Sequence, residues 1–203
     1  MDILGILFAL CIGVAISAAC GFRVFLPIFT IGILQRFGGD WGLPLTIPEE
    51  LSWAGNGFIL LGLGVATILE VAAFYIPWLD SLLDTISAPM AIIAGTVLTY
   101  CILDDASGTS RILLSLVGGG GSAGVVAGTT ALARSASTVL TAGLGNNVIA
   151  TSENGLSIFS VILALVFPIL GVIFLAIFLI VIIKIISHLR KKKKQHSAQA
   201  EAI

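Results

Sequence analysis

Long apolar runs are the feature that most limits what this chain can fold into. Several of them reach the roughly 18–20 residues needed to cross the hydrocarbon core of a bilayer. Only 10% of the 203 residues are charged, against about 25% in soluble domains. A bilayer offers no water to unpaired backbone groups, so spanning segments are helices or closed barrels, and the short alternating strands of a barrel are not visible. We therefore predict an all-α membrane protein, a polytopic helical bundle.

One stretch of this apolar sequence occurs twice. Residues 13–34 and 124–145 align without a gap at an offset of 111 and share five identities in 22 positions. Each copy carries a lone arginine, Arg23 or Arg134, inside a segment otherwise suited to hydrocarbon. A charge there costs roughly 2.5–3.5 kcal/mol on insertion scales, so both arginines are candidate functional residues. Apolar segments of low complexity match one another easily, so a chance likeness is the alternative to a duplication.

The first copy predicts a broken helix. Residues 3–19 form a first span, and residues 24–34, which contain Pro27, are long enough for half a membrane only. A re-entrant or broken helix of this kind is tolerated where protein or a water-filled cavity covers its backbone. The other expected elements are a loop at 35–54 with a short surface helix, spans at 57–75, 88–102, 112–133 and 156–186, an unwound glycine run at 118–121, and a loop at 146–154.

The repeat also predicts a topology. One span, one half-helix and one span per copy, plus a connector span at 88–102, give about five full spans and two re-entrant or broken half-helices in an inverted repeat. Repeat 1 covers about 3–76 and repeat 2 about 112–186, within a single transmembrane domain at 1–187. If the short segments cross fully, seven spans and parallel copies result, but 11 residues are too few to cross. Inverted repeats whose broken helices meet at the midplane are a recurring transporter design.

The charges predict an orientation in the membrane. Residues 190–194 hold five of the ten cations and follow the last apolar run directly. The positive-inside rule therefore places the basic tail, residues 188–203, in the cytoplasm and the N-terminus outside, in the bacterial inner membrane. Nucleic-acid binding is the other common interpretation of a basic run. A stop-transfer tail that also touches anionic lipid explains the same residues more simply, so no nucleic-acid partner is expected.

The two arginines predict an anion site near the midplane. A guanidinium presents a planar fork of donors that suits phosphate or carboxylate, and the helix ends at a break attract anions. Four hydroxyl residues follow the second arginine and are predicted to join the site: Ser135, Ser137, Thr138 and Thr141. The alternative is that these hydroxyls bond back to helix carbonyls.

Acidic residues are expected to act as counter-ions or coupling acids. Glu70 lies inside a predicted span, where an ionisable residue is a candidate proton or cation carrier. Three aspartates near the predicted span ends are further candidates: Asp80, Asp84 and Asp104. Two alternatives stay open. In the first, these acids form ion pairs with the arginines that only stabilise the helical bundle. In the second, the aspartates are solvated residues at helix ends.

The sequence gives little sign of catalytic chemistry. Both histidines lie in the tail, and the three cysteines show no metal-ligand spacing. The glycine run at 118–121 is not followed by lysine at the spacing of a nucleotide-binding loop. We therefore expect no metal and no cofactor, and a membrane lipid phosphatase is the remote enzymatic option.

At SAACGFRVFLPIFTIGIL and GTTALARSASTVLTAGLGN the chain resembles a family of small bacterial multi-pass membrane proteins classed as a domain of unknown function. The likeness spans most of residues 5–185; it implies a membrane protein and supplies no activity. Residues 25–28 and 134–138 are similar, more weakly, to motifs of the undecaprenyl-pyrophosphate phosphatases, which pair two re-entrant repeats. The chain lacks that family's glutamate just before the first motif and its histidine shortly after, so the resemblance does not imply phosphatase activity.

Together these patterns predict a small integral membrane transporter, flippase or channel. Its expected partners are the lipid bilayer and an anionic small molecule or lipid headgroup bound at the arginines. A homodimer is one expected assembly, since five crossings enclose little volume. The alternative function is a non-catalytic membrane scaffold or assembly factor in which the polar residues hold the bundle together.

Overall fold

The computed structural model describes residues 3–40, 47–104, 106–141, 143–177, 179–181 and 184. These residues form helices and turns with no strand among them, which confirms the predicted all-α membrane bundle. In chain order the helices are α1 (Ile3–Phe22), α2 (Phe25–Phe37), the 3-10 helix η1 (Glu49–Gly55), α3 (Gly57–Ala73), α4 (Pro77–Ile102), α5 (Gly108–Leu114), the π-helix η2 (Ser115–Gly120), α6 (Gly121–Thr141) and α7 (Asn146–Val166). A further apolar helix covers Pro168–Val181.

Within the residues that the structure describes, four helical segments are long and apolar enough to cross a membrane. They are Leu4–Phe22, Thr85–Ile102, Gly108–Thr141 and Asn146–Val166. The helices η1 and α3 meet at an angle of 74° and would form a fifth span if the bent pair is counted as one. The upper count of five agrees with the predicted number of full spans.

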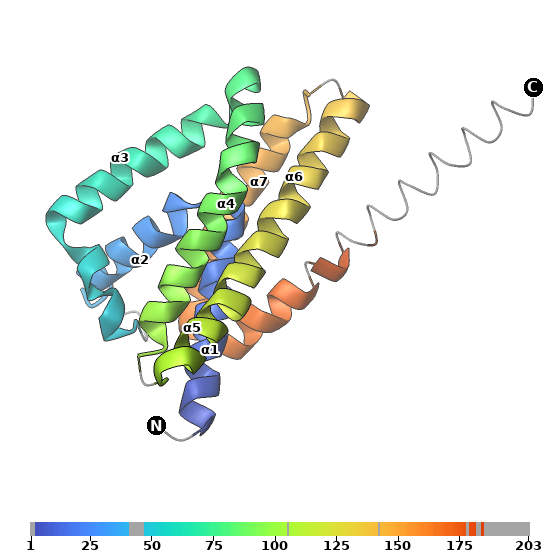
Figure 1. The fold of residues 1–203 in the computed structure, drawn as a ribbon. Coiled ribbons are helices and arrows are strands. Elements are labelled where there is room, and N and C mark those ends of the chain that lie inside the picture. The colour runs from blue at the N-terminus through green and yellow to red at the C-terminus, as the bar shows by residue number, and fades with distance from the viewer. Residues whose placement is uncertain are drawn as a thin grey trace, which may run out of the picture.

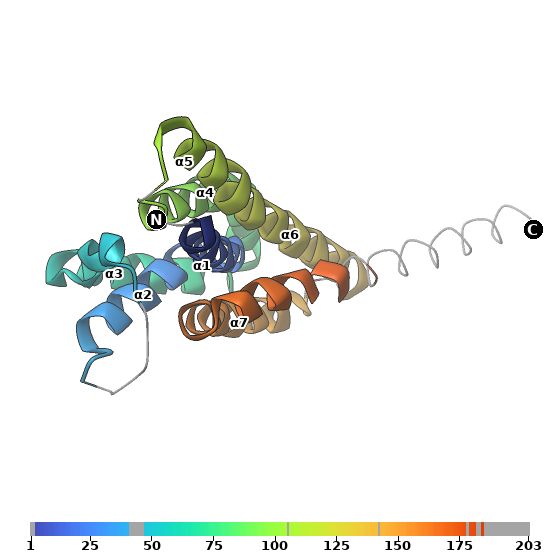
Figure 2. The same cartoon turned by 90° about the horizontal axis from the view of Figure 1, so that it is seen from below.

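Helix α1 forms the centre of the bundle because its small residues let other helices approach closely. Helices α4, α6 and α7 surround it (Figures 1 and 2). Ala15, Ser17 and Ala19 are almost completely buried, and Ser17 Oγ donates a hydrogen bond to the Gly95 carbonyl oxygen of α4 at 2.7 Å. The small residues of α1 therefore serve helix packing.

Helices α2, η1 and α3 form a side hairpin, residues 25–40 and 47–73, that packs on itself and lies to one side of the long helices (Figures 1 and 2). The predicted break between α1 and α2 is present at Arg23 and Val24. Pro27 is the third residue of α2, where its missing N–H would have no partner within the helix, so the proline starts this helix rather than kinking a longer one. At 13 residues, α2 belongs with the apolar helices too short to span.

The second copy differs from the prediction at two points. The glycine run at 118–121 does not unwind: its first part lies in the π-helix η2, which joins α5 and α6 into one helical run. Arg134 lies inside the unbroken helix α6, because the residues that follow it are Ser, Ala and Thr rather than a proline. The two copies therefore differ at their arginines, and the inverted repeat stays a prediction.

The predicted loop at 146–154 is also wrong, since these residues form the first turns of α7. The turn lies just before them, where Gly143 has a positive φ of 87°. The expected span at 156–186 is interrupted at Phe167, whose φ of −138° and ψ of 77° are not helical. Pro168 explains this break, because a proline disfavours the helical conformation of the residue before it.

Some sequence predictions fall outside the described residues. The basic tail at 188–203 is one of them. The backbone of Asp80 and Asp84 belongs to α4, but their side chains are not among those described.

The packing of α4 on α1 and on the glycine run can be tested with one substitution at two sites. A Cβ atom at Gly95 would lie 2.8 Å from the Gly119 carbonyl oxygen and 3.1 Å from the Ser17 Cβ, whereas a Cβ at Gly128 would meet nothing within 4 Å. We expect Gly95→Ala to destabilise the bundle by about 1–3 kcal/mol through overpacking. Gly128→Ala should stabilise α6 by about 0.5–1 kcal/mol. Thermal unfolding of the purified protein in detergent measures both, and equal melting temperatures for the two variants would contradict this packing.

Candidate functional site

The arginine of the first copy is placed by the break between α1 and α2. Arg23 follows the last residue of α1, and its side chain turns into the protein, where the residue is 1% exposed. Its Nε donates to the Asn154 Oδ1 at 2.6 Å, and its Nη2 donates to the Ala150 carbonyl oxygen at 3.1 Å. The same Nη2 lies 3.6 Å from the Glu153 Oε2. The break in the chain therefore directs one cation onto the first turns of α7.

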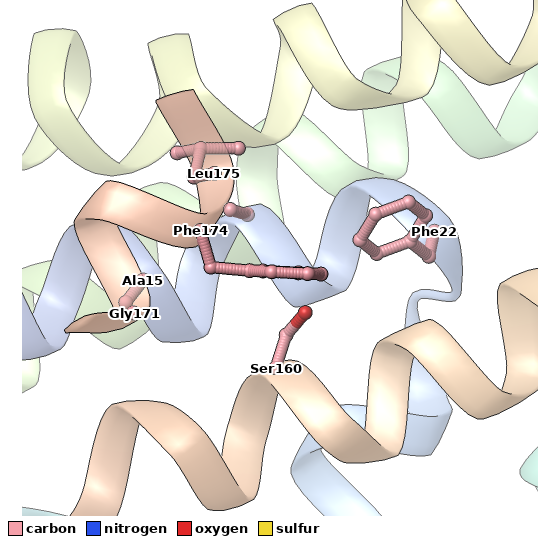
Figure 3. A pocket seen from close by; sticks show the side chains of 7 residues that line it. Ala15, Phe22, Ser160, Gly171, Phe174 and Leu175 are labelled. Atoms are coloured by element: carbon pink, nitrogen blue, oxygen red, sulfur yellow. The ribbon is translucent and has the colours of Figure 1, made fainter. Parts of the chain in front are cut away.

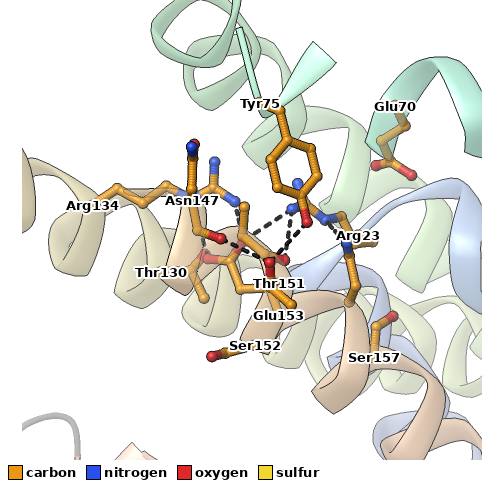
Figure 4. A network of polar contacts seen from close by, with 12 residues as sticks. Arg23, Glu70, Tyr75, Thr130, Arg134, Asn147, Thr151, Ser152, Glu153 and Ser157 are labelled. Carbon is orange, nitrogen blue, oxygen red and sulfur yellow. Dashed lines mark hydrogen bonds and ion pairs between the residues drawn. The ribbon is translucent and has the colours of Figure 1, made fainter. Parts of the chain in front are cut away.

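The arginine of the second copy reaches the same carboxylate from α6. Arg134 is 2% exposed, its Nε donates to the Glu153 Oε1 at 3.1 Å, and its Nη2 is ion-paired with the Glu153 Oε2. Glu153 is also 2% exposed, so three charged side chains share one buried position (Figure 4). The predicted meeting of Arg23 and Arg134 is thus present in the structure, and a carboxylate joins them.

An aromatic ring completes this cluster. Phe74, which follows α3 directly, is 4% exposed. The guanidinium carbons of Arg23 and Arg134 lie 3.7 Å and 4.1 Å from the centroid of its ring. A desolvated cation over an aromatic face gains about 2 kcal/mol. We call Arg23, Phe74, Arg134 and Glu153 the arginine cluster; it joins the ends of the side hairpin to α6 and α7.

The arginine cluster contains two positive charges and one negative charge. Two guanidiniums share the single carboxylate of Glu153, and the Arg23 Nη1 is buried without a hydrogen-bond partner. A buried donor left unpaired costs about 1–3 kcal/mol. Arg134 lies two turns before the end of α6 and Glu153 two turns after the start of α7, so the cluster sits about 10 Å inside the end of the bundle at which these helices are joined.

Glu70 lies beside the cluster and closes the side hairpin. Its two carboxylate oxygens accept the backbone N–H of Val24 at 2.6 Å and of Phe25 at 3.0 Å. These amides belong to the first turn of α2, where a helix has unpaired donors and a positive dipole end that favours a carboxylate. Glu70, predicted as a coupling acid or counter-ion, therefore holds the last turn of α3 against the start of α2.

The four hydroxyl candidates bond mainly within the α6 region. Ser135, Thr138 and Thr141 each donate to a carbonyl oxygen one turn earlier, and Ser137 contacts the Thr141 hydroxyl at 3.4 Å. Thr138 also accepts from Asn146 at 2.9 Å, and Thr141 accepts from the Gly145 N–H. These bonds fit the alternative, in which the hydroxyls serve the helix and its C-terminal turn.

Asp104 forms a separate pair. Its Oδ1 lies 2.9 Å from Arg111 Nη1, and its side chain is 62% exposed. Arg111 also lies over the Tyr100 ring, at 4.0 Å from the centroid. This aspartate is therefore engaged with an arginine other than the two of the cluster.

Glu153 was missed because it falls in the stretch predicted as a loop. The turn-forming residues at 145–147 and 152–155 favour that interpretation locally. A helical stripe was nevertheless present: Ala150, Glu153, Ser157, Ser160 and Ala164 are spaced by three or four residues, and all are buried on α7. This spacing predicts one helix face of small residues with a carboxylate among them.

Chemically, the cluster presents donors and positive charge rather than a nucleophile or a metal-ligand set. Among the described residues, no group of three or more His, Cys, Asp or Glu side chains is placed to hold a metal ion. The arrangement suits recognition of a carboxylate or phosphate, since Glu153 already occupies it in that way.

Comparison with known proteins gives a family and no activity. The family described as a domain of unknown function (DUF4126) matches residues 10–188. No curated protein and no solved structure matches. The comparisons give no support to the weaker likeness to the undecaprenyl-pyrophosphate phosphatases.

Removing the carboxylate of Glu153 should be far more harmful than removing a carboxylate from an exposed ion pair. We expect Glu153→Gln to destabilise the protein by about 3–5 kcal/mol, because both buried guanidiniums lose the carboxylate with which they are ion-paired. Asp104→Asn, which breaks the part-exposed pair with Arg111, should cost about 0–1 kcal/mol. Equilibrium unfolding in mixed detergent micelles compares the two variants. Similar losses would mean that the buried charges are compensated by groups other than Glu153.

Proposed function

Because the chain belongs to the DUF4126 family, whose function is unknown, we propose from the geometry of its own residues that it binds an anion at the arginine cluster and carries it through the membrane. The observation that supports this most is the sharing of one carboxylate by two buried guanidiniums, with the Arg23 Nη1 left unpaired. A site of this kind has unused capacity for a second carboxylate or a phosphate. The apolar helices that could span a bilayer place it within a membrane-type protein.

The carboxylate of Glu153 occupies the position that a substrate anion would take. It accepts from the Nε of Arg134 and is paired with the Nη2 atoms of both arginines, as a bound carboxylate or phosphate would be. In this proposal the structure is the closed, unloaded state, and an incoming anion replaces Glu153 on one guanidinium. The exchange keeps the buried charges paired at each stage, which lowers the cost of opening the bundle.

A membrane scaffold is the second candidate function. The burial of the cluster favours this function, because Arg23 and Arg134 are 1% and 2% exposed and each already forms a hydrogen bond to α7. In this alternative the ions join α1, α6, α7 and the side hairpin permanently, and no substrate exchanges with Glu153. The two candidates differ in whether flux depends on the arginines independently of stability.

Substitution of Arg23 by lysine distinguishes the transporter from the scaffold, because the two functions predict different effects on anion flux. Arg23→Lys keeps the charge but loses the planar fork that reaches Asn154 and Ala150 together. We expect at least a tenfold loss of anion flux, equivalent to about 1.4 kcal/mol, in proteoliposomes loaded with inorganic phosphate or with a fluorescent phosphatidic acid. Arg111→Lys, at the pair with Asp104, is the matched control and should keep its flux. Absence of flux in the unmodified protein, with Arg23→Lys changing only stability, would instead support the scaffold.

We also propose that the protein lies in the bacterial inner membrane with its N-terminus outside and its C-terminus in the cytoplasm. The number of spans decides whether the two chain ends lie on opposite sides of the membrane. Five crossings place them on opposite sides, and four place them on the same side. Reporter fusions, a phosphatase active only outside and a fluorescent protein active only inside, should give opposite signals at the two ends. The same signal at both ends would show that η1 and α3 do not cross together.

A further inference from the structure

Two hollows lie near α1 and the side hairpin, and they differ in what they can hold. The first is enclosed by α1, α7 and the helix after α7, and Phe22 and Phe174 fill it so closely that no water fits (Figure 3). The second has a volume of about 330 Å³ and lies between the side hairpin and α4. A volume of this size falls in the range of about 300–1,000 Å³ that holds small molecules.

The second hollow, which we call the hairpin cavity, is almost wholly apolar. Its described lining is Val24, Phe25, Ala66, Leu69, Glu70, Ala73, Phe74, Leu83, Ile86, Ser87 and Met90. Glu70 is the charged member of this set, and both of its oxygens already accept backbone N–H groups of α2. A polar or charged molecule would therefore find few partners in the cavity, whereas a hydrocarbon chain would lose nothing by entering.

The position of the cavity links it to the membrane on one side and to the arginine cluster on the other. Leu69, Ile86 and Met90, with exposed fractions of 64%, 45% and 37%, mark its outer edge among other exposed apolar residues of α3 and α4. Phe74 is also part of its lining, and the guanidinium carbons of Arg23 and Arg134 lie 3.7 Å and 4.1 Å from the centroid of that ring. The lining of the cavity thus includes an aromatic ring that also contacts two buried cations.

We propose that the hairpin cavity holds the hydrocarbon chain of an anionic amphiphile whose headgroup is recognised by Arg23 and Arg134. This deepens the proposed function and rests on it, since it takes the arginine cluster as the anion site. The chain enters between α3 and α4 from the bilayer, and the headgroup reaches the guanidiniums when the Phe74 ring turns aside. The unpaired Arg23 Nη1 is the donor available to that headgroup. A carboxylate and a phosphate share this chemistry.

Photo-crosslinking of the full chain in nanodiscs tests the proposal. The probes are a 16-carbon fatty acid, a lysophosphatidic acid and a fatty alcohol, each with a diazirine in the chain. We expect the two anionic probes to label the peptides that contain Leu69, Ile86 or Met90, and the neutral alcohol to label them at least tenfold less. Stronger labelling by one anionic probe identifies the headgroup as carboxylate or phosphate.

Two phenylalanine substitutions on neighbouring residues provide the matched comparison. Ala73→Phe fills the cavity, whereas Ala72→Phe adds the same ring on the exposed face of α3. We expect labelling to fall at least fivefold in Ala73→Phe and to stay unchanged in Ala72→Phe, with melting temperatures recorded for both. If Ala73→Phe unfolds the hairpin, Ala66→Phe takes its place, because Ala66 lines the same cavity about two turns earlier along α3.

The outcomes separate this inference from the proposed function. Equal labelling in Ala73→Phe and Ala72→Phe would overturn the chain site, even if phosphate flux still depended on Arg23. Labelling that is lost in Ala73→Phe but equal for the alcohol and both anionic probes would overturn recognition of the headgroup, whereas the proposed anion function would be overturned only by phosphate flux that does not depend on Arg23. Anionic labelling that falls in both Ala73→Phe and Arg23→Lys, but not in Ala72→Phe, is the result expected if both hold.

Discussion

The structure depends on the burial of two guanidiniums around one carboxylate. Neither Arg23 nor Arg134 has access to water, so each needs partners that the fold must bring to it. Those partners come from α7, which supplies Glu153, Asn154 and the Ala150 carbonyl, and from Phe74 at the end of α3. In a membrane, where apolar contacts between helices give little net driving force, such polar contacts help to decide which helices meet.

The same requirement explains the shape of the side hairpin. A chain that ends one helix at Phe22 and begins another at Phe25 frees backbone N–H groups inside the protein. Glu70 accepts two of them, so the far end of the hairpin returns to the point where the hairpin began. Phe74, one turn later, then reaches both arginines. The break, the carboxylate cap and the aromatic cover are parts of one arrangement rather than separate features.

Much of this could be predicted from the sequence because it depends on local composition. Apolar length predicted the spans, and the cost of burying a lone arginine singled out Arg23 and Arg134 before any fold was known. The role of Glu153 could not be predicted from local composition, because the Asn and Gly residues beside it favour a loop. Tertiary packing of α7 on α1 outweighs this local preference and keeps these residues helical. The helix break expected after Arg134 is absent because the polar residues there do not interrupt the helix. The hydroxyls of Ser135 and Thr138 bond to carbonyl oxygens one turn earlier, and α6 continues.

Stability and any exchange of ligands at this site are therefore coupled through Glu153. While it pairs with both guanidiniums, α6 and α7 are held together and the cluster stays dry. If Glu153 left without a replacement, two buried cations would lie against one aromatic ring without the carboxylate that pairs with both of them, which is costly. An anion that enters must consequently arrive with its own oxygens before Glu153 withdraws. The hairpin cavity is the described space that shares Phe74 with the cluster, and its apolar lining is the reason for proposing that the anion carries a hydrocarbon chain.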